Sequence, residues 1–388
     1  MPLDMMCKIL NKISFKENKR RYLNLKGIFS RRFAYKGPDV VQIDLTDRCN
    51  SHCLICWLHS LFVKEDKNTK ELDFITLKNF ISYIAKSGTK EIIFSGGGEP
   101  FFYSKIWEVL EFTQKAGLTF RINTNFTLLS REDINRLLSF NNLVSLTVSI
   151  WAGEASLYSK LHNRDSDIFF KIKNNLKFLN ISKPRALYVK VFVVVNNLNY
   201  SKLAGLIDLS TETGCNAIEL GVPDVIPGVT DSFLLSKEQL SFLKQDFIKI
   251  IRNLNGKNHG IKIINKNIFL RRISNSKACY GAYDSFVERI PCYAGWTFLR
   301  LRANGDFNSC LKSHRIPIGN FYKDSFPLVW NGLLQQEFRE KGLSIPKDKK
   351  YFKVIGNSFD EDVGCKRVCD NILTNEHLYK IIKFLPWI

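Results

Sequence analysis

The feature that most constrains the fold is an alternation of short β-branched runs with longer amphipathic stretches, which begins near residue 38. This alternation is typical of parallel strands joined by crossover helices. Six runs are expected to form strands: Val40–Leu45, Glu91–Ser95, Thr119–Asn123, Leu143–Ile150, Tyr188–Val195 and Ala217–Val222. Helical patterns lie between them, at Ile75–Lys86, Ser104–Lys115, Arg131–Ser139, Ile168–Leu179 and Ser201–Thr213. The pattern predicts an α/β fold, a partial (βα)6 TIM-like barrel whose functional loops follow the carboxyl ends of the strands.

The rhythm changes after the sixth expected strand. A long helix is predicted over Ser236–Leu254, followed by a region with fewer regular helices and five of the ten cysteines. In that region Phe298–Arg302 and Phe307–Ser309 flank Asn304-Gly305, which is a strong signal for a β-hairpin. We therefore expect a basic N-terminal extension over residues 1–37, a barrel over 38–255 and a smaller α+β extension over 256–388.

The composition favours a folded protein in a reducing compartment. The chain has 388 residues, of which 45% are hydrophobic and 24% are charged, enough to bury a substantial core. Neither a signal-peptide pattern nor an apolar run long enough to span a membrane is present in the sequence. A cytoplasmic location is therefore expected, where clustered thiols more often bind metal than form disulfides.

The formal net charge of +20 would favour anionic partners such as nucleic acid or an acidic membrane surface. Much of this charge lies in Lys16–Arg32, and the rest is spread over the predicted helices. No RNA-binding module is visible in the sequence. We therefore interpret the charge mainly as a solvated surface and do not expect nucleic acid as a partner.

Three cysteines stand in the loop directly after the first expected strand. Cys49, Cys53 and Cys56 form Cys-x3-Cys-x2-Cys, and three thiolates in one loop can converge on one iron-sulfur cluster. A structural zinc site needs a fourth ligand, which His52 or His59 could supply, but the spacing differs from the paired Cys-x2-Cys of zinc ribbons. A cluster with three protein ligands leaves one iron open to a substrate or cofactor.

The second expected strand ends in a run of glycines followed by an acid, Gly96-Gly97-Gly98-Glu99-Pro100. A backbone without side chains would there meet a carboxylate at the barrel mouth, which suits an ammonium group. Taken alone, the run is explained equally well as a tight turn.

Together these two motifs resemble the radical S-adenosylmethionine (radical SAM) superfamily, in which Cys-x3-Cys-x2-Cys follows strand one and Gly-Gly-Glu follows strand two. The resemblance implies that the three cysteines hold a [4Fe-4S] cluster whose open iron is chelated by the amino and carboxylate groups of SAM. It also implies that Gly97, Gly98 and Glu99 bind the cofactor, with Glu99 on its amino group. One departure is Ile55 before the third cysteine, where the family often has an aromatic residue; here Trp57 follows instead.

Polar residues also end the third and fourth expected strands. By the same resemblance, Asn125 and Ser149 stand at positions that contact the ribose and carboxylate of SAM, although helix caps and turns explain them equally well. Val195-Asn196-Asn197 would lie near the adenine. Three acids near the sixth strand are candidate substrate groups: Glu219, Asp224 and Asp231.

A second set of cysteines lies in the C-terminal region. Cys292 and Cys310 bracket the expected hairpin, and Cys365 and Cys369 would be one turn apart if their segment were helical. Four thiolates complete a closed cluster. The set resembles the SPASM and twitch extensions of the superfamily, and its size fits the twitch type, with one auxiliary [4Fe-4S] cluster. The remaining cysteines are interpreted as structural: Cys7, Cys215 and Cys279.

By this resemblance the chain is an enzyme that takes electrons from a low-potential donor such as flavodoxin or ferredoxin. It would cleave SAM to a 5'-deoxyadenosyl radical, which abstracts hydrogen from a substrate. Residues 149–153 and 56–60 are similar to radical enzymes of surface-polysaccharide loci, so a sugar-like or other small hydroxylated substrate is our main expectation. Three alternatives stay open: a maturase of a ribosomally made peptide, an RNA-modifying radical enzyme, and a non-enzymatic iron-sulfur carrier or sensor.

Overall fold

The computed structural model describes residues 15–64, 69–256, 260–357 and 362–384. Its centre is a ten-stranded sheet in the order β10-β9-β8-β1-β2-β3-β4-β5-β6-β7. The eight strands from β8 to β7 in this order are parallel to their neighbours, whereas β9 pairs antiparallel with both β8 and β10. The strands are β1 Val40–Ile43, β2 Glu91–Phe94, β3 Thr119–Thr124, β4 Leu143–Ser149, β5 Tyr188–Val194, β6 Ala217–Gly221, β7 Lys262–Ile263, β8 Phe298–Leu301, β9 Asp306–Asn308 and β10 Gly319–Asn320.

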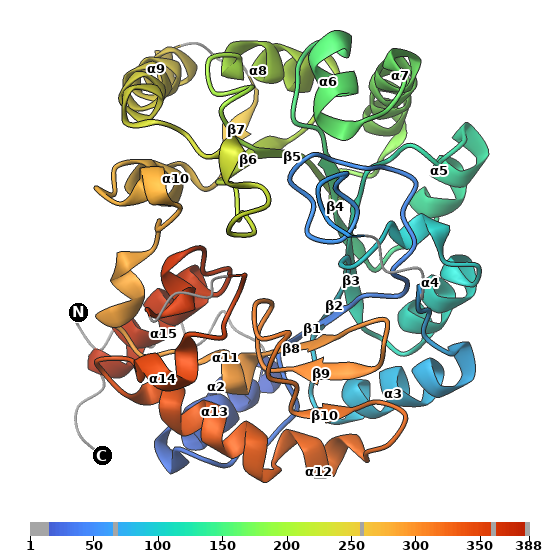
Figure 1. Ribbon diagram of the computed structural model, residues 1–388. Helices are drawn as coiled ribbons and strands as arrows, with labels where there is room; N and C mark the ends of the chain where they lie inside the picture. Colours follow the sequence, from blue (N-terminus) through green and yellow to red (C-terminus); the bar gives the residue numbers. More distant parts are fainter. Residues whose placement is uncertain (1–14, 65–68, 257–259, 358–361, 385–388) are drawn as a thin grey trace.

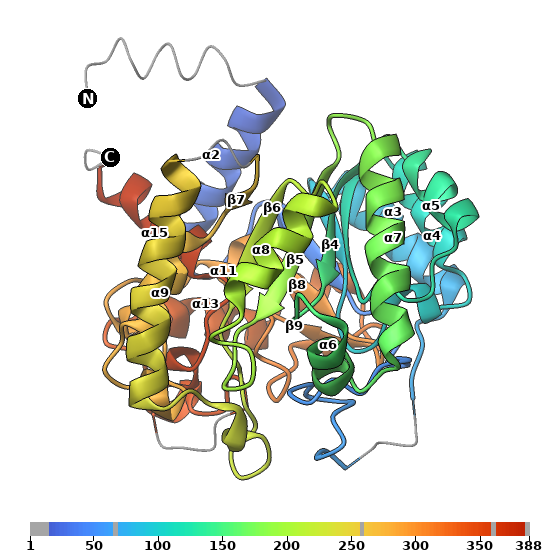
Figure 2. The same ribbon diagram turned by 90° about the horizontal axis from the view of Figure 1, so that it is seen from above.

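Helices cover the outer face of the curved sheet, and the C-terminal helices gather on one side of it (Figure 1; Figure 2). Those of the barrel are α3 Phe74–Lys86, α4 Ile106–Lys115, α5 Arg131–Leu138, α6 Ala155–His162, α7 Ser166–Ser182, α8 Leu203–Glu212 and α9 Lys237–Gly256. The others are α2 Phe15–Ser30, α10 Lys266–Ile273, α11 Ala294–Thr297, α12 Phe326–Trp330, α13 Leu333–Leu343, α14 Lys349–Phe352 and α15 Ile372–Lys383. No described helix is long and apolar enough to cross a bilayer.

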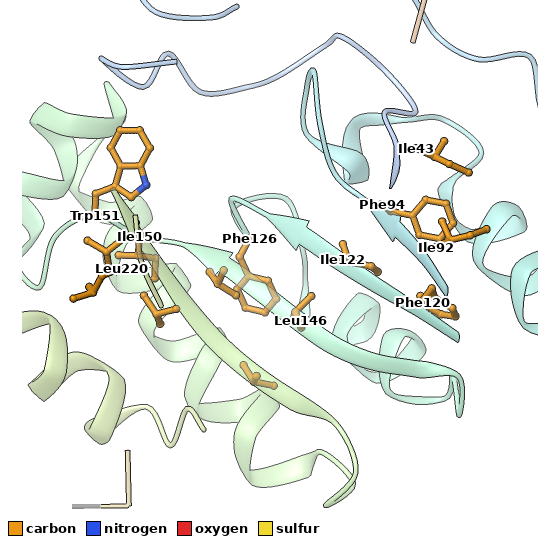
Figure 3. Packing of buried hydrophobic residues seen from close by; sticks show 14 of the residues in the cluster. Ile43, Ile92, Phe94, Phe120, Ile122, Phe126, Leu146, Ile150, Trp151 and Leu220 are labelled. Carbon is orange, nitrogen blue, oxygen red and sulfur yellow. The ribbon is translucent and has the colours of Figure 1, made fainter. Parts of the chain in front are cut away.

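The core lies between the strands and these helices. Most residues of β1, β2, β4 and β6 are buried, as is usual for parallel strands that are covered on both faces. Buried side chains from neighbouring strands pack side by side, among them Ile92, Phe94, Phe120 and Ile122 (Figure 3). Phe94 and Phe120 meet edge to face, with ring centroids 6.0 Å apart. This packing fixes the strand register, and the register determines which residues reach the barrel mouth.

The expected α/β partial barrel is confirmed, and each of the six expected strands begins where the structure begins it. The expected hairpin is confirmed as well, since β8 and β9 pair across a turn in which Gly305 has φ +89°. Two features were not predicted from the sequence. One is the short helix α6, and the other is the pairing of β8 with β1, which joins the C-terminal region to the barrel sheet. The segment from Cys365 to Cys369 is not an α-helix; Gly364–Lys366 forms a 3-10 turn there.

The described part of the basic N-terminal segment packs on the C-terminal region. The indole Nε1 of Trp296 donates to the Phe33 carbonyl at 3.0 Å, and Ala34 exchanges two hydrogen bonds with the Asn331 side chain. A cavity of about 640 Å³ lies beside this contact, lined by α2, α12 and the end of α3. It opens at the amino-terminal edge of β1 and β2, so it is on the opposite side of the sheet from the loops that follow these strands.

Candidate active site

The loop after β1 carries the first three cysteines at the carboxyl edge of the sheet. Cys49, Cys53 and Cys56 are half-buried free thiols, and each lies close enough to another to affect its ionisation. Burial raises the pKa of Cys49 to about 12 and also raises the pKa of the other two. As bare thiols they would stay protonated, so holding them as thiolates requires a compensating positive charge such as iron.

Asn125, directly after β3, and the end of α6 hold this loop in place. The Asn125 amide nitrogen donates to Asn50 Oδ1 at 2.8 Å and lies 4.0 Å from Cys49 Sγ. The Leu54 backbone N–H donates to the Leu161 carbonyl at 3.0 Å. His162, the last residue of α6, is buried with its Nδ1 3.1 Å from Cys53 Sγ. Burial lowers the pKa of His162 to about 3, so the ring is neutral.

The glycine run after β2 packs against the cysteine loop. A Cβ on Gly98 would lie 2.0 Å from the Arg48 carbonyl oxygen, and a Cβ on Gly97 would lie 2.3 Å from Asp47 Oδ1. Gly96 has φ +121° and sits against Asp44. Gly96 and Gly98 are therefore required for the close approach of the two loops, whereas at Gly97 the end of the Asp47 side chain could shift.

Glu99 is buried between the loops after β2 and β3. Its Oε1 accepts from the Thr124 hydroxyl at 2.6 Å, and its Oε2 accepts from the Asn125 backbone N–H at 2.7 Å. Burial raises the pKa of Glu99 to about 7, although these hydrogen bonds favour the ionised form. Oε1 also accepts from the Phe101 backbone N–H at 3.3 Å, whereas Oε2 has one partner, so Oε2 retains the capacity to accept from an ammonium group.

The other expected cofactor residues also have protein partners. Asn125 Oδ1 accepts from the backbone N–H and the hydroxyl of Thr127, so both ends of its side chain organise loops. Ser149 accepts a hydrogen bond from the indole of Trp151 at 3.0 Å. The buried Asn196 side chain caps its own turn through Leu198 N. These contacts match the interpretation of the residues as turn formers and caps.

The four C-terminal cysteines come together from three segments. Cys310 is buried and the others are half-buried. Burial raises the pKa of Cys310, Cys365 and Cys369, and the nearby Cys292 thiol raises each further. Cys369 is fixed by its own backbone N–H, which donates to Asp284 at 2.8 Å. Of the residues interpreted as structural, Cys215 is buried against Thr213 and Asn180, Cys279 packs at the core edge, and Cys7 lies outside the described residues.

A cation lies among these thiols. Lys347 is buried, and its Nζ donates to the Ile290 carbonyl at 3.1 Å and the Gly342 carbonyl at 2.6 Å. Burial lowers its pKa, whereas Cys292, Cys365 and Cys369 raise it. A fixed ammonium at this position offsets part of the charge that several thiolates would bring.

A polar junction joins the two cysteine regions. Lys312, two residues after Cys310, forms an ion pair with Asp224 from the loop after β6, and it lies 3.5 Å from Asp370. Its ammonium is 4.1 Å from the ring centroid of Trp57, whose indole donates to the Asp224 carbonyl at 3.0 Å. Burial alone would lower the pKa of Lys312, but Asp224 and Asp370 raise it above its usual value.

Of the three expected substrate acids, Asp224 is the one that this junction contains. Glu219 instead pairs with Lys190 on the neighbouring strand, and Asp231 accepts from the Gly228 backbone N–H within its own loop. The second carboxylate oxygen of Asp224, Oδ1, is buried and has no hydrogen-bond partner among the residues that the structure describes.

The thiol sets suit clusters better than single ions. Among the described residues, no three His, Cys, Asp or Glu side chains converge closely enough to hold one metal ion. In a four-iron cluster each thiolate binds a different iron, so the ligands stand farther apart than around one ion. The absence of a single-ion site among the described residues is therefore compatible with both cysteine sets as cluster ligands.

The comparison with protein families decides between a radical enzyme and a generic iron-sulfur protein. Residues 43–210 match the radical SAM superfamily. The chain belongs to the radical SAM superfamily. Residues 292–357 match the SPASM family, described as an iron-sulfur cluster-binding domain, which implies a [4Fe-4S] site in the extension as well. The SPASM match includes Cys292 and Cys310 and ends before Cys365 and Cys369.

Several curated proteins are similar to the chain. The PqqA peptide cyclase of Bradyrhizobium diazoefficiens is 25% identical over 184 residues, which are 47% of this chain and 46% of the cyclase. The tungsten-containing aldehyde ferredoxin oxidoreductase cofactor-modifying protein of Pyrococcus furiosus is 23% identical over 309 residues, 76% of this chain and 82% of that protein. The chain spans about half or less of the first curated relatives it matches.

A solved radical SAM structure has the same fold. Streptococcus suis SuiB bound to S-adenosylmethionine superposes with a TM-score of 0.63 at 17% identity, covering 84% of this chain and 72% of SuiB. The structure therefore confirms the predicted fold, and the family match confirms the predicted superfamily of enzymes.

Four residues of the site were assigned no role from the sequence: Trp57, His162, Lys312 and Lys347. Among them, Trp57 was noted only as the residue after the third cysteine. His162 stands 109 residues from Cys53, and Lys312 stands 88 residues from Asp224. Neither pair leaves a local signal. The one available clue was position, because Trp57 directly follows Cys56 and Lys312 follows Cys310 by two residues.

Proposed function

We propose that the chain reductively cleaves SAM at a cluster held by Cys49, Cys53 and Cys56 and uses the resulting radical to oxidise a peptide. The observation that carries the proposal is the polar junction of Trp57 and Lys312 between two separate cysteine sets. When bound, the cluster and SAM would supply a 5'-deoxyadenosyl radical that abstracts hydrogen. The electrons would come from a low-potential donor such as flavodoxin or ferredoxin.

Within this proposal each site residue has a specific task. Glu99, Gly97 and Gly98 would bind the amino group of SAM, with Asn125 and Ser149 near its ribose and carboxylate. The four C-terminal cysteines would hold one auxiliary [4Fe-4S] cluster. At the junction, Asp224 Oδ1 is a buried acceptor without a partner among the described residues, so it can take up the proton that leaves the substrate radical, while the auxiliary cluster would accept the electron.

The peptide substrate is better supported than the sugar-like substrate expected from the sequence. One relative is named as a peptide cyclase, and SuiB has also been solved with the precursor peptide SuiA. The polysaccharide resemblance rested on two short runs, residues 149–153 and 56–60. Trp151 in the first run is explained by packing, because its ring lies 4.9 Å from that of His162.

The cofactor part of the proposal is tested by anaerobic reconstitution. We expect about eight irons per chain, two four-iron clusters, and formation of 5'-deoxyadenosine after reduction with dithionite in the presence of SAM. Cys53→Ser should lose 5'-deoxyadenosine formation, and Cys365→Ser should lose iron while retaining the first cluster. Cys215→Ser is the matched control because this buried thiol lies outside both sets. Intact reduced clusters without SAM cleavage would favour the carrier or sensor alternative.

The substrate part needs a separate assay. Synthetic peptides from short reading frames beside the gene are incubated with the reduced enzyme and SAM, and their masses are compared with those from Asp224→Asn. A peptide that loses hydrogen only with the unaltered enzyme supports the proposal. Oxidation of a saccharide mixture under the same conditions, with every peptide unchanged, would return the assignment to the sugar-like substrate.

A further inference from the structure

The side chain of His162 is a second contact to the cysteine loop that no part of the cofactor binding described above uses. It ends α6 and is buried, at 1% exposure. Its Nδ1 lies 3.1 Å from Cys53 Sγ, and its Nε2 lies 3.1 Å from the backbone nitrogen of Trp151. Both ring nitrogens therefore have a partner.

These two contacts decide which nitrogen carries the proton. The backbone N–H of Trp151 can only donate, so Nε2 of His162 must accept and has no hydrogen. A neutral imidazole has one hydrogen, which then stands on Nδ1. Nδ1 faces Cys53 Sγ, so His162 donates a hydrogen bond to the sulfur.

The ring has little freedom to turn away from this position. It stacks on Tyr158, with centroids 4.5 Å apart and an interplanar angle of 26°, and the Trp151 ring lies on it at 4.9 Å. The preceding residue, Leu161, accepts the backbone hydrogen bond from Leu54. Leu161 and His162 at the end of α6 thus contact two consecutive residues of the cysteine loop, Leu54 and Cys53.

The three sulfurs differ in the donors they receive. Cys56 Sγ accepts from the His59 backbone N–H at 3.4 Å, and Cys49 Sγ lies 4.0 Å from the Asn125 amide. Backbone N–H groups of Asn50 and Ser51 also act on Cys49, and that of Leu58 acts on Cys56. The donor to Cys53, at 3.1 Å, is instead a rigid, buried ring. Hydrogen bonds to cluster sulfurs are among the determinants of reduction potential, together with burial.

We propose that His162 is a positioning residue that raises the reduction potential of the cluster held by Cys49, Cys53 and Cys56, through its Nδ1–H bond to Cys53. The bond stabilises negative charge on the sulfur, and a reduced cluster has one more negative charge than an oxidised one. The inference rests on the cluster of the proposed function and is independent of its peptide substrate.

Two substitutions separate the two ring nitrogens. The Asn side chain reaches the place of Nδ1, so His162→Asn keeps a donor toward Cys53 and loses the acceptor for Trp151. The Gln side chain reaches the place of Nε2, so His162→Gln keeps the acceptor and loses the donor. Reconstituted holoprotein without SAM is titrated with a potentiometric mediator set, and the reduced cluster is counted by electron paramagnetic resonance.

We expect the ratio of reduced to oxidised cluster at a fixed potential to fall about tenfold in His162→Gln, which is about 59 mV for a one-electron couple. His162→Asn should stay within about twofold of the unaltered protein. In pulsed electron-nuclear experiments after exchange into D2O, the unaltered protein and His162→Asn should have an exchangeable deuteron coupled to the cluster, and His162→Gln should lack it.

The proposal is overturned if all three proteins titrate at the same potential with the same iron content. It is also overturned if both variants bind no cluster, because His162 would then be needed for assembly, or if the Asn variant shifts as far as the Gln variant. Absence of a cluster from the unaltered protein would instead refute the proposed function. The auxiliary cluster, titrated in the same samples, is the internal control and should not shift.

Discussion

At the scale of single residues, the site is built from close approaches that allow little substitution. Gly98 packs on the backbone of Arg48, and Glu99 is held between Thr124 and Asn125. The family motif therefore has a packing role as well as a cofactor role. This explains why the tight-turn interpretation and the binding interpretation of the glycine run were equally good from the sequence.

Gly98→Ala should damage the cysteine loop. The new Cβ would lie 2.0 Å from a backbone oxygen, so one loop must shift, at a cost of about 1–3 kcal/mol in the free energy of unfolding. Iron content after reconstitution should fall in parallel. Gly205→Ala in α8 is the control, since its Cβ would meet nothing closer than 3.9 Å, and it should be neutral or stabilise by about 0.5–1 kcal/mol. Full iron binding by Gly98→Ala would contradict the packing role.

Glu99 should make stability depend on pH. Its folded pKa of about 7 lies above the ordinary value of 4.5, so the native state binds the proton more tightly than the unfolded chain. The stabilising contribution is complete below about pH 4.5 and is lost as the pH rises through 7. In urea unfolding of reduced, metal-free protein, the difference between the unaltered protein and Glu99→Gln should therefore change by about 3 kcal/mol from pH 4.5 to 8, in favour of the variant at high pH.

The matched control for this pH dependence is Glu132→Gln, an exposed glutamate in the first turn of α5. Its free energy of unfolding should differ from that of the unaltered protein by no more than about 1 kcal/mol at every pH, the size expected for a charge in the first turn of a helix. A pH profile for Glu99→Gln that also runs parallel to the unaltered protein would mean that Glu99 is ionised in the native state at neutral pH.

At the scale of helices and strands, the sequence predicted what depends on local pattern and missed what depends on distant partners. Each barrel strand is a β-branched run bounded by turn residues, so its limits could be located within two residues. The two-residue strand β7 and the short helix α6 have too few residues for a period to be recognised. The pairing of β8 with β1 joins residues more than 250 positions apart, and periodicity carries no information on such a contact.

The β8-β1 pairing is reinforced by a buried ion pair. Arg300 on β8 contacts Asp44, which directly follows β1, and their side chains are 9% and 1% exposed. Arg300→Ala should lower the free energy of unfolding by about 3–5 kcal/mol, because it leaves a buried carboxylate without its cation. Arg302→Ala is the control: its ion pair with Asp306 is more exposed and 3.8 Å long, so its loss should cost less than about 1 kcal/mol. Equal losses in both variants, measured by urea unfolding, would contradict this assignment.

At the scale of the whole molecule, the barrel and the extension meet at the junction of Trp57, Asp224, Lys312 and Asp370. Three of these residues follow a candidate cluster cysteine by one or two positions, and Asp224 follows β6. The fold thus places the carboxylate of Asp224 next to residues that are one or two positions from a cysteine of each set. The sequence named Asp224 among three acids and had no means of choosing, because the choice depends on Lys312 and Trp57.

Asp224→Asn separates substrate oxidation from cofactor cleavage. The amide keeps the size of the side chain but cannot take up a proton, so substrate oxidation should fall by about 10²-fold or more. Lys312 keeps Asp370 as a partner at 3.5 Å, so the fold and both cluster sites should persist. We therefore expect unchanged iron content and substrate-free 5'-deoxyadenosine formation within about twofold of the unaltered enzyme. Asp231→Asn, in the same connection between β6 and α9, should leave all three quantities unchanged, because Asp231 lies outside the junction. Two results would contradict this role. If Asp224→Asn lost iron or SAM cleavage together with substrate oxidation, the junction would only join the barrel to the extension. If the variant retained full substrate oxidation, the substrate would bind elsewhere.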